Sequence, residues 1–115
     1  MKNKITTIQL FDTRYKRFIK KFPTLEAEML QLKKDLLANP KTGTLITENA
    51  YKIRLASTDK NKGKSGGFRV ITYLIEELVT DNEIETEIVL LIIYDKSEES
   101  SYNKNAVIKI IKDYL

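Results

Sequence analysis

The sequence predicts a single α+β domain over residues 1–115, with its elements in the order β-α-α-β-β-β-α. Two stretches near the N-terminus repeat apolar residues with helical spacing, and three later stretches have strand patterns. Consecutive strands that are joined by a loop and a hairpin favour antiparallel pairing. We therefore expect an antiparallel four-stranded sheet, with an N-terminal helix pair and a short C-terminal helix packed on it.

The first elements are a strand and two helices. Residues Ile5–Phe11 are rich in β-forming types and are expected to form the first strand. In residues 13–22 the large apolar side chains recur at i, i+3, i+4 and i+7, which is typical of an amphipathic helix. A second helix is expected to start after Thr24 and to end before Asn39-Pro40, because the residue before a proline disfavours helical geometry.

The rest of the chain is dominated by strand patterns. Residues 51–56 alternate between apolar and basic side chains, and residues 68–75 continue the sheet after a glycine-bearing loop. The Asp-Asn pair at 81–82 indicates the turn of a long hairpin. Residues 88–94 are apolar on both faces, which predicts the central and most buried strand. An apolar stripe at helical spacing predicts a terminal helix within residues 106–115.

The composition narrows the chemistry that is open to this chain. Hydrophobic residues make up 42% of the sequence, which is enough for a compact core. There is no cysteine and no histidine, so disulfides, thiolate metal sites and the commonest general base are all missing. No apolar run is long enough to cross a bilayer or to form a signal peptide. We expect a soluble cytoplasmic protein with no metal, no cofactor and no contact with membranes.

The charge is distributed unevenly along the chain. Residues 1–69 carry 16 Lys and Arg against 6 Asp and Glu, a net charge of +10. Residues 70–115 carry 4 Lys and Arg against 10 Asp and Glu, a net charge of −6. A basic half of this size suggests a polyanionic partner, and lysine-rich solvated helix faces would give the same count.

A nucleotide-binding loop is not expected. Gly63-Lys64-Ser65 resembles the end of a P-loop, but that motif needs a glycine where Thr58 stands, and it needs a helix where a strand is predicted. The carboxylates of residues 76–87 occur without His or Cys and are best explained as a solvated hairpin surface.

A cluster of cations surrounds the loop between the two basic strands. Lys52 and Arg54 share one strand face, and Arg69 can join them if the two strands pair. Arginine binds phosphate in a bidentate manner and lysine offers a point charge, so the cluster suits a phosphodiester. The alternative is that these side chains are only the solvated face of a sheet. The other residues that are expected to border this face are Lys60, Lys62, Lys64, Tyr73, Tyr94, Lys96 and Tyr102.

Three segments resemble a known family. They are Tyr51–Ala56 (YKIRLA), Gly63–Tyr73 (GKSGGFRVITY) and Ile93–Glu98 (IYDKSE). Together with the order of elements, they resemble the RelE/ParE toxin superfamily of type II toxin–antitoxin systems, in its HigB/RelE-like branch. The resemblance covers nearly the whole chain, and the glycine-containing segment is its most specific part.

The resemblance implies a bacterial toxin that enters the ribosome and cleaves mRNA, with an antitoxin protein as its partner. Lys52, Arg54 and Arg69 match the basic residues that bind and polarise the scissile phosphate, and they are expected to be catalytic together with Lys96 and Tyr102. Residues expected to contact the RNA are Lys60, Lys62, Lys64, Tyr73 and Tyr94. Ser97 stands where RelE has arginine, which leaves the proton-transfer residues open.

Two other functions remain compatible with the sequence. One is a ParE-like inhibitor of DNA gyrase that has no nuclease activity. The other is an inactive binding member of the fold, whose basic face only holds an acidic partner. The fold alone does not separate these three functions. The cations on the strands and the glycine-containing segment favour the endoribonuclease.

Overall fold

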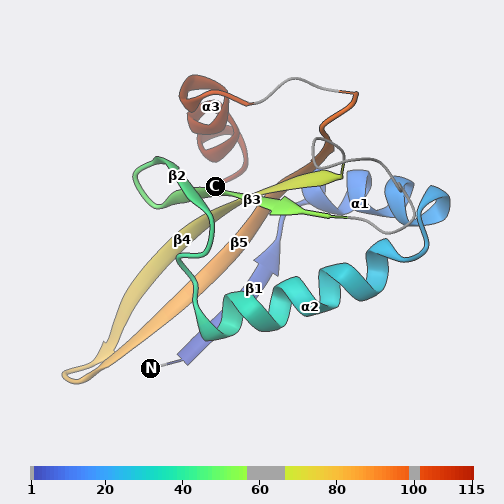
Figure 1. Cartoon of the computed structure of the whole chain (residues 1–115). Helices are drawn as coiled ribbons and strands as arrows, with labels where there is room; N and C mark the ends of the chain where they lie inside the picture. Colours follow the sequence, from blue (N-terminus) through green and yellow to red (C-terminus); the bar gives the residue numbers. More distant parts are fainter. Residues whose placement is uncertain (1, 57–66, 99–101) are drawn as a thin grey trace.

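The computed structural model describes residues 2–56, 67–98 and 102–115, which form a five-stranded sheet between two layers of helices (Figure 1). The strands are β1 (Lys2–Thr7), β2 (Thr44–Thr47), β3 (Ala50–Leu55), β4 (Phe68–Thr80) and β5 (Glu83–Asp95), in the spatial order β1-β5-β4-β3-β2. Helices α1 (Gln9–Lys21) and α2 (Leu25–Ala38) cover one face, and α3 (Lys104–Tyr114) lies on the other. The α+β class is confirmed.

The sheet is mixed, so the expected four-stranded antiparallel sheet is wrong in two respects. The first is that β1 pairs with β5 in parallel, with Lys2 beside Glu85 and Thr7 beside Leu90. The hairpin pattern of the later strands says nothing about where the first strand joins. A parallel neighbour requires a long crossover, and the chain between β1 and β5 contains both helices and three strands.

The second difference is the edge strand β2, which the sequence pattern did not reveal. It has four residues and pairs antiparallel with β3. Half of its residues are exposed, and a short edge strand of this kind needs no regular alternation of apolar side chains. Gly43 leads into it with φ of +105°, and a Cβ atom there would lie 2.5 Å from the carbonyl oxygen of Lys52. Glycine is therefore required for the chain to turn back against β3.

The first strand starts earlier than the expected Ile5 and ends at Thr7 instead of Phe11, because α1 begins at Gln9. Phe11 was predicted to lie in the strand, but it is fully buried in the first turns of the helix and its ring stacks on Tyr15, 5.7 Å away. Phe11, Tyr15, Phe18 and Phe22 follow one another at helical spacing and pack in the same cluster. The apolar stripe of the helix thus starts one turn earlier than the pattern in residues 13–22 suggested.

The remaining predicted elements are confirmed. Helix α2 starts after Thr24 and ends before Asn39-Pro40, and the turn at residues 81–82 closes the β4–β5 hairpin. Residues 88–94 of β5 are all buried, because β5 lies between β1 and β4 and is covered by helices on both faces. The terminal helix begins two residues earlier than the predicted stretch.

Candidate nucleic-acid interface

Four cationic side chains line one cavity of about 270 Å³. They are Lys52 and Arg54 from β3, Arg69 from β4, and Lys96 just after β5; Thr44 of β2 completes the described lining. We call this set of five residues the cationic groove. The described lining carries a formal charge of +4 and contains no carboxylate, a charge pattern that favours an anionic ligand.

The alternation of β3 explains why two of these cations share a face. Tyr51, Ile53 and Leu55 pack toward α1 and α2, so the side chains between them project to the opposite face. The β3–β4 register then places Arg54 directly beside Arg69. This pairing confirms the predicted faces of both strands, and it puts two guanidinium groups beside each other on neighbouring strands.

Arg69 is the most buried of the four cations, with 6% of its surface exposed. Its Nη1 donates a hydrogen bond to the carbonyl oxygen of Phe68 at 3.2 Å. A charged group at this depth is stable only when it is hydrogen-bonded or paired, and such bonds restrict its orientation. The groove therefore has a positioned guanidinium on its floor, with Lys52 half-buried and Arg54 exposed beside it.

Lys96 is held in place by the segment that leaves β5. The Oδ1 atom of the buried Asp95 accepts hydrogen bonds from the backbone N of Ser97 at 2.9 Å and from its hydroxyl at 2.7 Å. The backbone N of Lys96 donates to the carbonyl oxygen of Gly67 at 3.3 Å. Asp95 thus positions the last cation, a role the sequence analysis missed although Asp95-Lys96-Ser97 follows the apolar strand directly. The sequence pattern also did not identify Thr44 as a lining residue, because it did not reveal strand β2.

Gly67 has a conformational role at the start of β4. Its φ is +88°, and a Cβ atom there would lie 2.9 Å from the carbonyl oxygen of Leu55. This backbone geometry favours glycine whether or not a ligand approaches. Of the other predicted loop residues, Lys60, Lys62 and Lys64 lie outside the described part of the chain.

The predicted tyrosines belong to the packing on the α3 face. Tyr94 is fully buried, and its ring lies 4.9 Å from that of Tyr102. Tyr73, Tyr94 and Tyr102 pack in the cluster that includes Val107 of α3, and none of them is among the described residues lining the groove. The burial of Tyr94 leaves its ring inaccessible to a nucleic-acid base, so we assign it to the core. The structure brings together Lys52, Arg54, Arg69 and Lys96. Tyr94 is the cross-strand partner of Arg69, so the tyrosines lie on the same face of the sheet, under α3.

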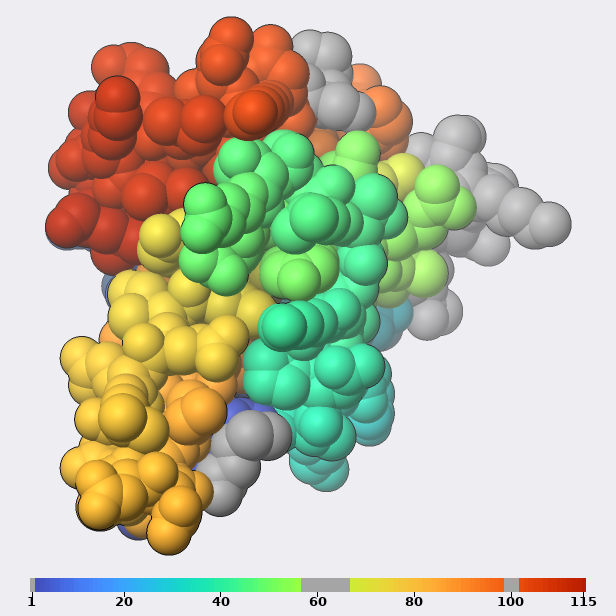
Figure 2. All heavy atoms as spheres, turned by 90° about the vertical axis from the view of Figure 1, so that its left-hand side faces the viewer, coloured from blue at the N-terminus to red at the C-terminus, as the bar shows by residue number. Residues whose placement is uncertain are grey.

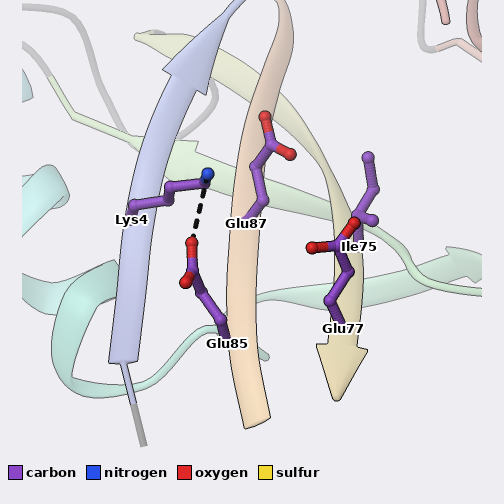
Figure 3. Close-up of a pocket in the computed structure, with 5 residues that line it drawn as sticks. All are labelled: Lys4, Ile75, Glu77, Glu85 and Glu87. Atoms are coloured by element: carbon purple, nitrogen blue, oxygen red, sulfur yellow. Dashed lines mark ion pairs between the residues drawn. The ribbon is translucent and has the colours of Figure 1, made fainter. Parts of the chain in front are cut away.

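The carboxylates of the β4–β5 hairpin form a separate polar cluster with β1 (Figure 3). Lys4 Nζ lies 3.1 Å from Glu85 Oε1, and the Thr6 hydroxyl donates to Glu87 Oε2 at 2.8 Å. The hydrogen bond to Glu85 and the surrounding carboxylates raise the pKa of Lys4. The enclosed space is only about 10 Å³, enough for one water molecule. Among residues 2–56, 67–98 and 102–115, no group of three or more His, Cys, Asp or Glu is arranged to hold a metal ion.

The fold and the groove define this chain as an α+β protein with four cationic side chains gathered at one face of its sheet. No protein-family model matches the chain. Within the described segments, none of the helices has the length and apolar character that crossing a membrane requires.

Proposed function

We propose that this protein is a metal-independent endoribonuclease that cleaves mRNA on the ribosome and serves as the toxin of a type II toxin–antitoxin system. The observation that carries the proposal is the convergence of four cations from β3, β4 and the end of β5 in one groove. The resemblance of residues 51–56, 63–73 and 93–98 to RelE/ParE toxins supports the same function, since the cations lie in those segments.

The groove suits cleavage by the RNA's own 2′-hydroxyl. That oxygen attacks the adjacent phosphorus, the bond to the 5′-oxygen of the next nucleotide breaks, and negative charge builds up on the phosphate oxygens. In this proposal Arg69 and Arg54, which are neighbours on β4 and β3, bind those oxygens in a bidentate manner. Lys52 and Lys96 are the lining residues able to exchange a proton, because arginine stays protonated in proteins. Tyr102 packs on Tyr94, the cross-strand partner of Arg69, and is the other residue that we propose for proton transfer.

The proposed partners follow from the same surface. Within the cytoplasm, the ribosome would present mRNA in an extended form to the groove, and an antitoxin protein would neutralise the toxin by covering the cations with acidic groups. Both interactions are electrostatic in origin and should weaken as the salt concentration rises.

A translating extract tests the proposal directly. Purified protein is expected to cut a reporter mRNA only while ribosomes translate it, and a chelating agent should not prevent the cuts. Primer extension would locate the cuts, and addition of a translation-initiation inhibitor is the matched control. Intact mRNA together with inhibition of gyrase supercoiling would contradict the proposal and would favour a ParE-like function.

Phosphate contacts in the groove can be counted through salt dependence. Lys52→Ala and Arg54→Ala are each expected to reduce the slope of log affinity against log salt by about 0.7, the value for one phosphate contact on single-stranded nucleic acid. The measurement is fluorescence anisotropy with an RNA that carries 2′-O-methyl groups and cannot be cleaved. Lys34→Ala on the exposed surface of α2 is the control and should leave the slope unchanged. If Lys52→Ala and Arg54→Ala give the same slope as Lys34→Ala and the unmodified protein, RNA binds at another surface.

A further inference from the structure

Strand β4 extends well beyond its neighbour β3. The two strands pair from Phe68 to Tyr73, and the backbone N of Leu74 makes one more bond, 2.9 Å long, to the carbonyl oxygen of Asn49. Residues 75–80 continue the strand and pair with β5 on their other side. Within the described part of the chain, no strand lies along the outer edge of this stretch. Figure 2 views the molecule from this side, with the β4 segment (yellow) continuing past β2 and β3 (green).

The backbone alternation identifies the groups that this open edge offers. In a strand, the N–H and C=O of one residue point to the same side, and those of the next residue point to the other. Leu74 donates toward β3, so Glu76 and Leu78 direct their backbone groups to the same outer edge. The register with β5 shifts between Leu78 and Thr80, which ends the regular alternation. Four residues at about 3.3 Å each give a regular edge of about 13 Å over residues 75–78.

The sheet has two other edges. β2 has four residues. β1 is tied to the end of α2, where the Asn3 side chain donates to the carbonyl oxygen of Leu37 at 2.8 Å. The outer edge of residues 75–78 is a third open edge of the described sheet, and exposed edges of this kind act as templates for an additional strand.

Apolar side chains flank this edge. Leu78 and Ile84 are cross-strand partners and share one face of the hairpin, where 71% and 41% of their surfaces are exposed. Val79, at the register shift that follows Leu78, is 54% exposed. A strand that is added beside Leu78 would cover this apolar surface with its own alternate side chains, which adds burial to the backbone hydrogen bonds.

The charge of the hairpin selects the partner. Residues 76–87 contain six Asp and Glu and no Lys or Arg, and Lys4 of β1 is paired with one of the carboxylates. Such a surface repels nucleic acid. It also disfavours pairing with the same edge of a second copy, because that would bring Glu76 and Glu77 against their equivalents. A segment that carries Lys or Arg is the complementary occupant.

We propose that the outer edge of residues 75–78 binds an extended, basic segment of a protein partner by strand addition. The backbone groups of Glu76 and Leu78 supply the hydrogen bonds, the exposed apolar side chains supply burial, and the carboxylates set the preference for a basic sequence. This inference does not depend on the proposed nuclease function, since it involves none of the residues of the cationic groove.

Peptide binding to the full ¹⁵N-labelled chain tests the proposal. The probe is a short acetylated peptide of alternating lysine and valine, and the matched control is the same peptide with glutamate in place of lysine. NMR titration should show saturable shifts of residues 75–80 with the lysine peptide, together with slower amide hydrogen exchange at Glu76 and Leu78. Binding of both peptides with equal affinity, or exchange rates that do not change, would overturn the proposal.

Two variants separate strand addition from simple charge attraction. Leu78→Pro removes one backbone donor at a position where an edge strand tolerates proline, and it should weaken lysine-peptide binding about tenfold. Glu76→Lys should also weaken binding, whereas Glu26→Lys, the same charge change on α2, should not. Unchanged affinity in Leu78→Pro that folds normally would overturn the proposal. If Leu78→Pro does not fold, equal affinities of Glu76→Lys and Glu26→Lys for the lysine peptide would overturn the proposal.

Discussion

Replacing Arg69 with alanine is expected to lower the rate of RNA cleavage by about 10²- to 10³-fold, the usual cost of removing one preorganised donor to a developing negative charge. Arg69 is the best positioned cation of the groove, because it is nearly buried and its Nη1 is bonded to the Phe68 carbonyl oxygen. The measurement is cleavage of the reporter mRNA in the translating extract, and loss of growth arrest in cells should accompany it.

The controls for this prediction separate catalysis from folding. Arg17→Ala removes the same charge from an exposed position on α1 and should leave cleavage unchanged. Arg69→Lys keeps the charge but loses the bidentate geometry, so it should retain only part of the activity. Circular dichroism should show that Arg69→Ala remains folded, since alanine removes a side chain from the lining of the groove and leaves both apolar clusters intact. A folded Arg69→Ala protein with full activity would exclude Arg69 from the site.

Replacing Phe68 with alanine is expected to lower the free energy of unfolding by about 3–5 kcal/mol. Phe68 is fully buried beneath α1, with ring centroids 4.9 Å from Phe18 and 5.5 Å from Phe22. Alanine would leave a cavity among these rings, and the lost energy is a large part of the 5–15 kcal/mol that stabilises a typical domain. Urea unfolding followed by circular dichroism measures the change.

The same strand provides a control for this prediction. Leu78→Ala lies on the exposed part of β4 and should change the free energy of unfolding by no more than about 0.5 kcal/mol. Phe68→Leu should cost less than alanine because it fills most of the cavity. A small effect of Phe68→Ala, similar to that of Leu78→Ala, would mean that the aromatic cluster between α1 and the sheet does not hold the domain together.

Much of the candidate site could be predicted because strand geometry is local. Side chains alternate along any strand, so the apolar positions of β3 were enough to place Lys52 and Arg54 on the opposite face. The approach of Arg69 depended on the pairing of β3 with β4, which a single connecting loop favoured. Strand alternation did not place Lys96, because its position depends on the turn in which Asp95 accepts hydrogen bonds from Ser97. The burial of Tyr94 followed from its place in the apolar stretch 88–94, whereas its packing against Tyr102 and the α3 cluster depended on the tertiary structure.

The sequence alone determined the type of nearly every element and the face that each one buries. Those features depend on backbone sterics and on apolar periodicity within a short window, which Phe18 in α1 and Ile53 in β3 illustrate. Only the tertiary structure decided that β1 lies parallel to β5, that β2 closes the other edge, and that residues 75–80 remain open along one side. The reason is that strand order depends on contacts between residues such as Lys2 and Glu85, and no local pattern in the chain encodes a pairing over that separation.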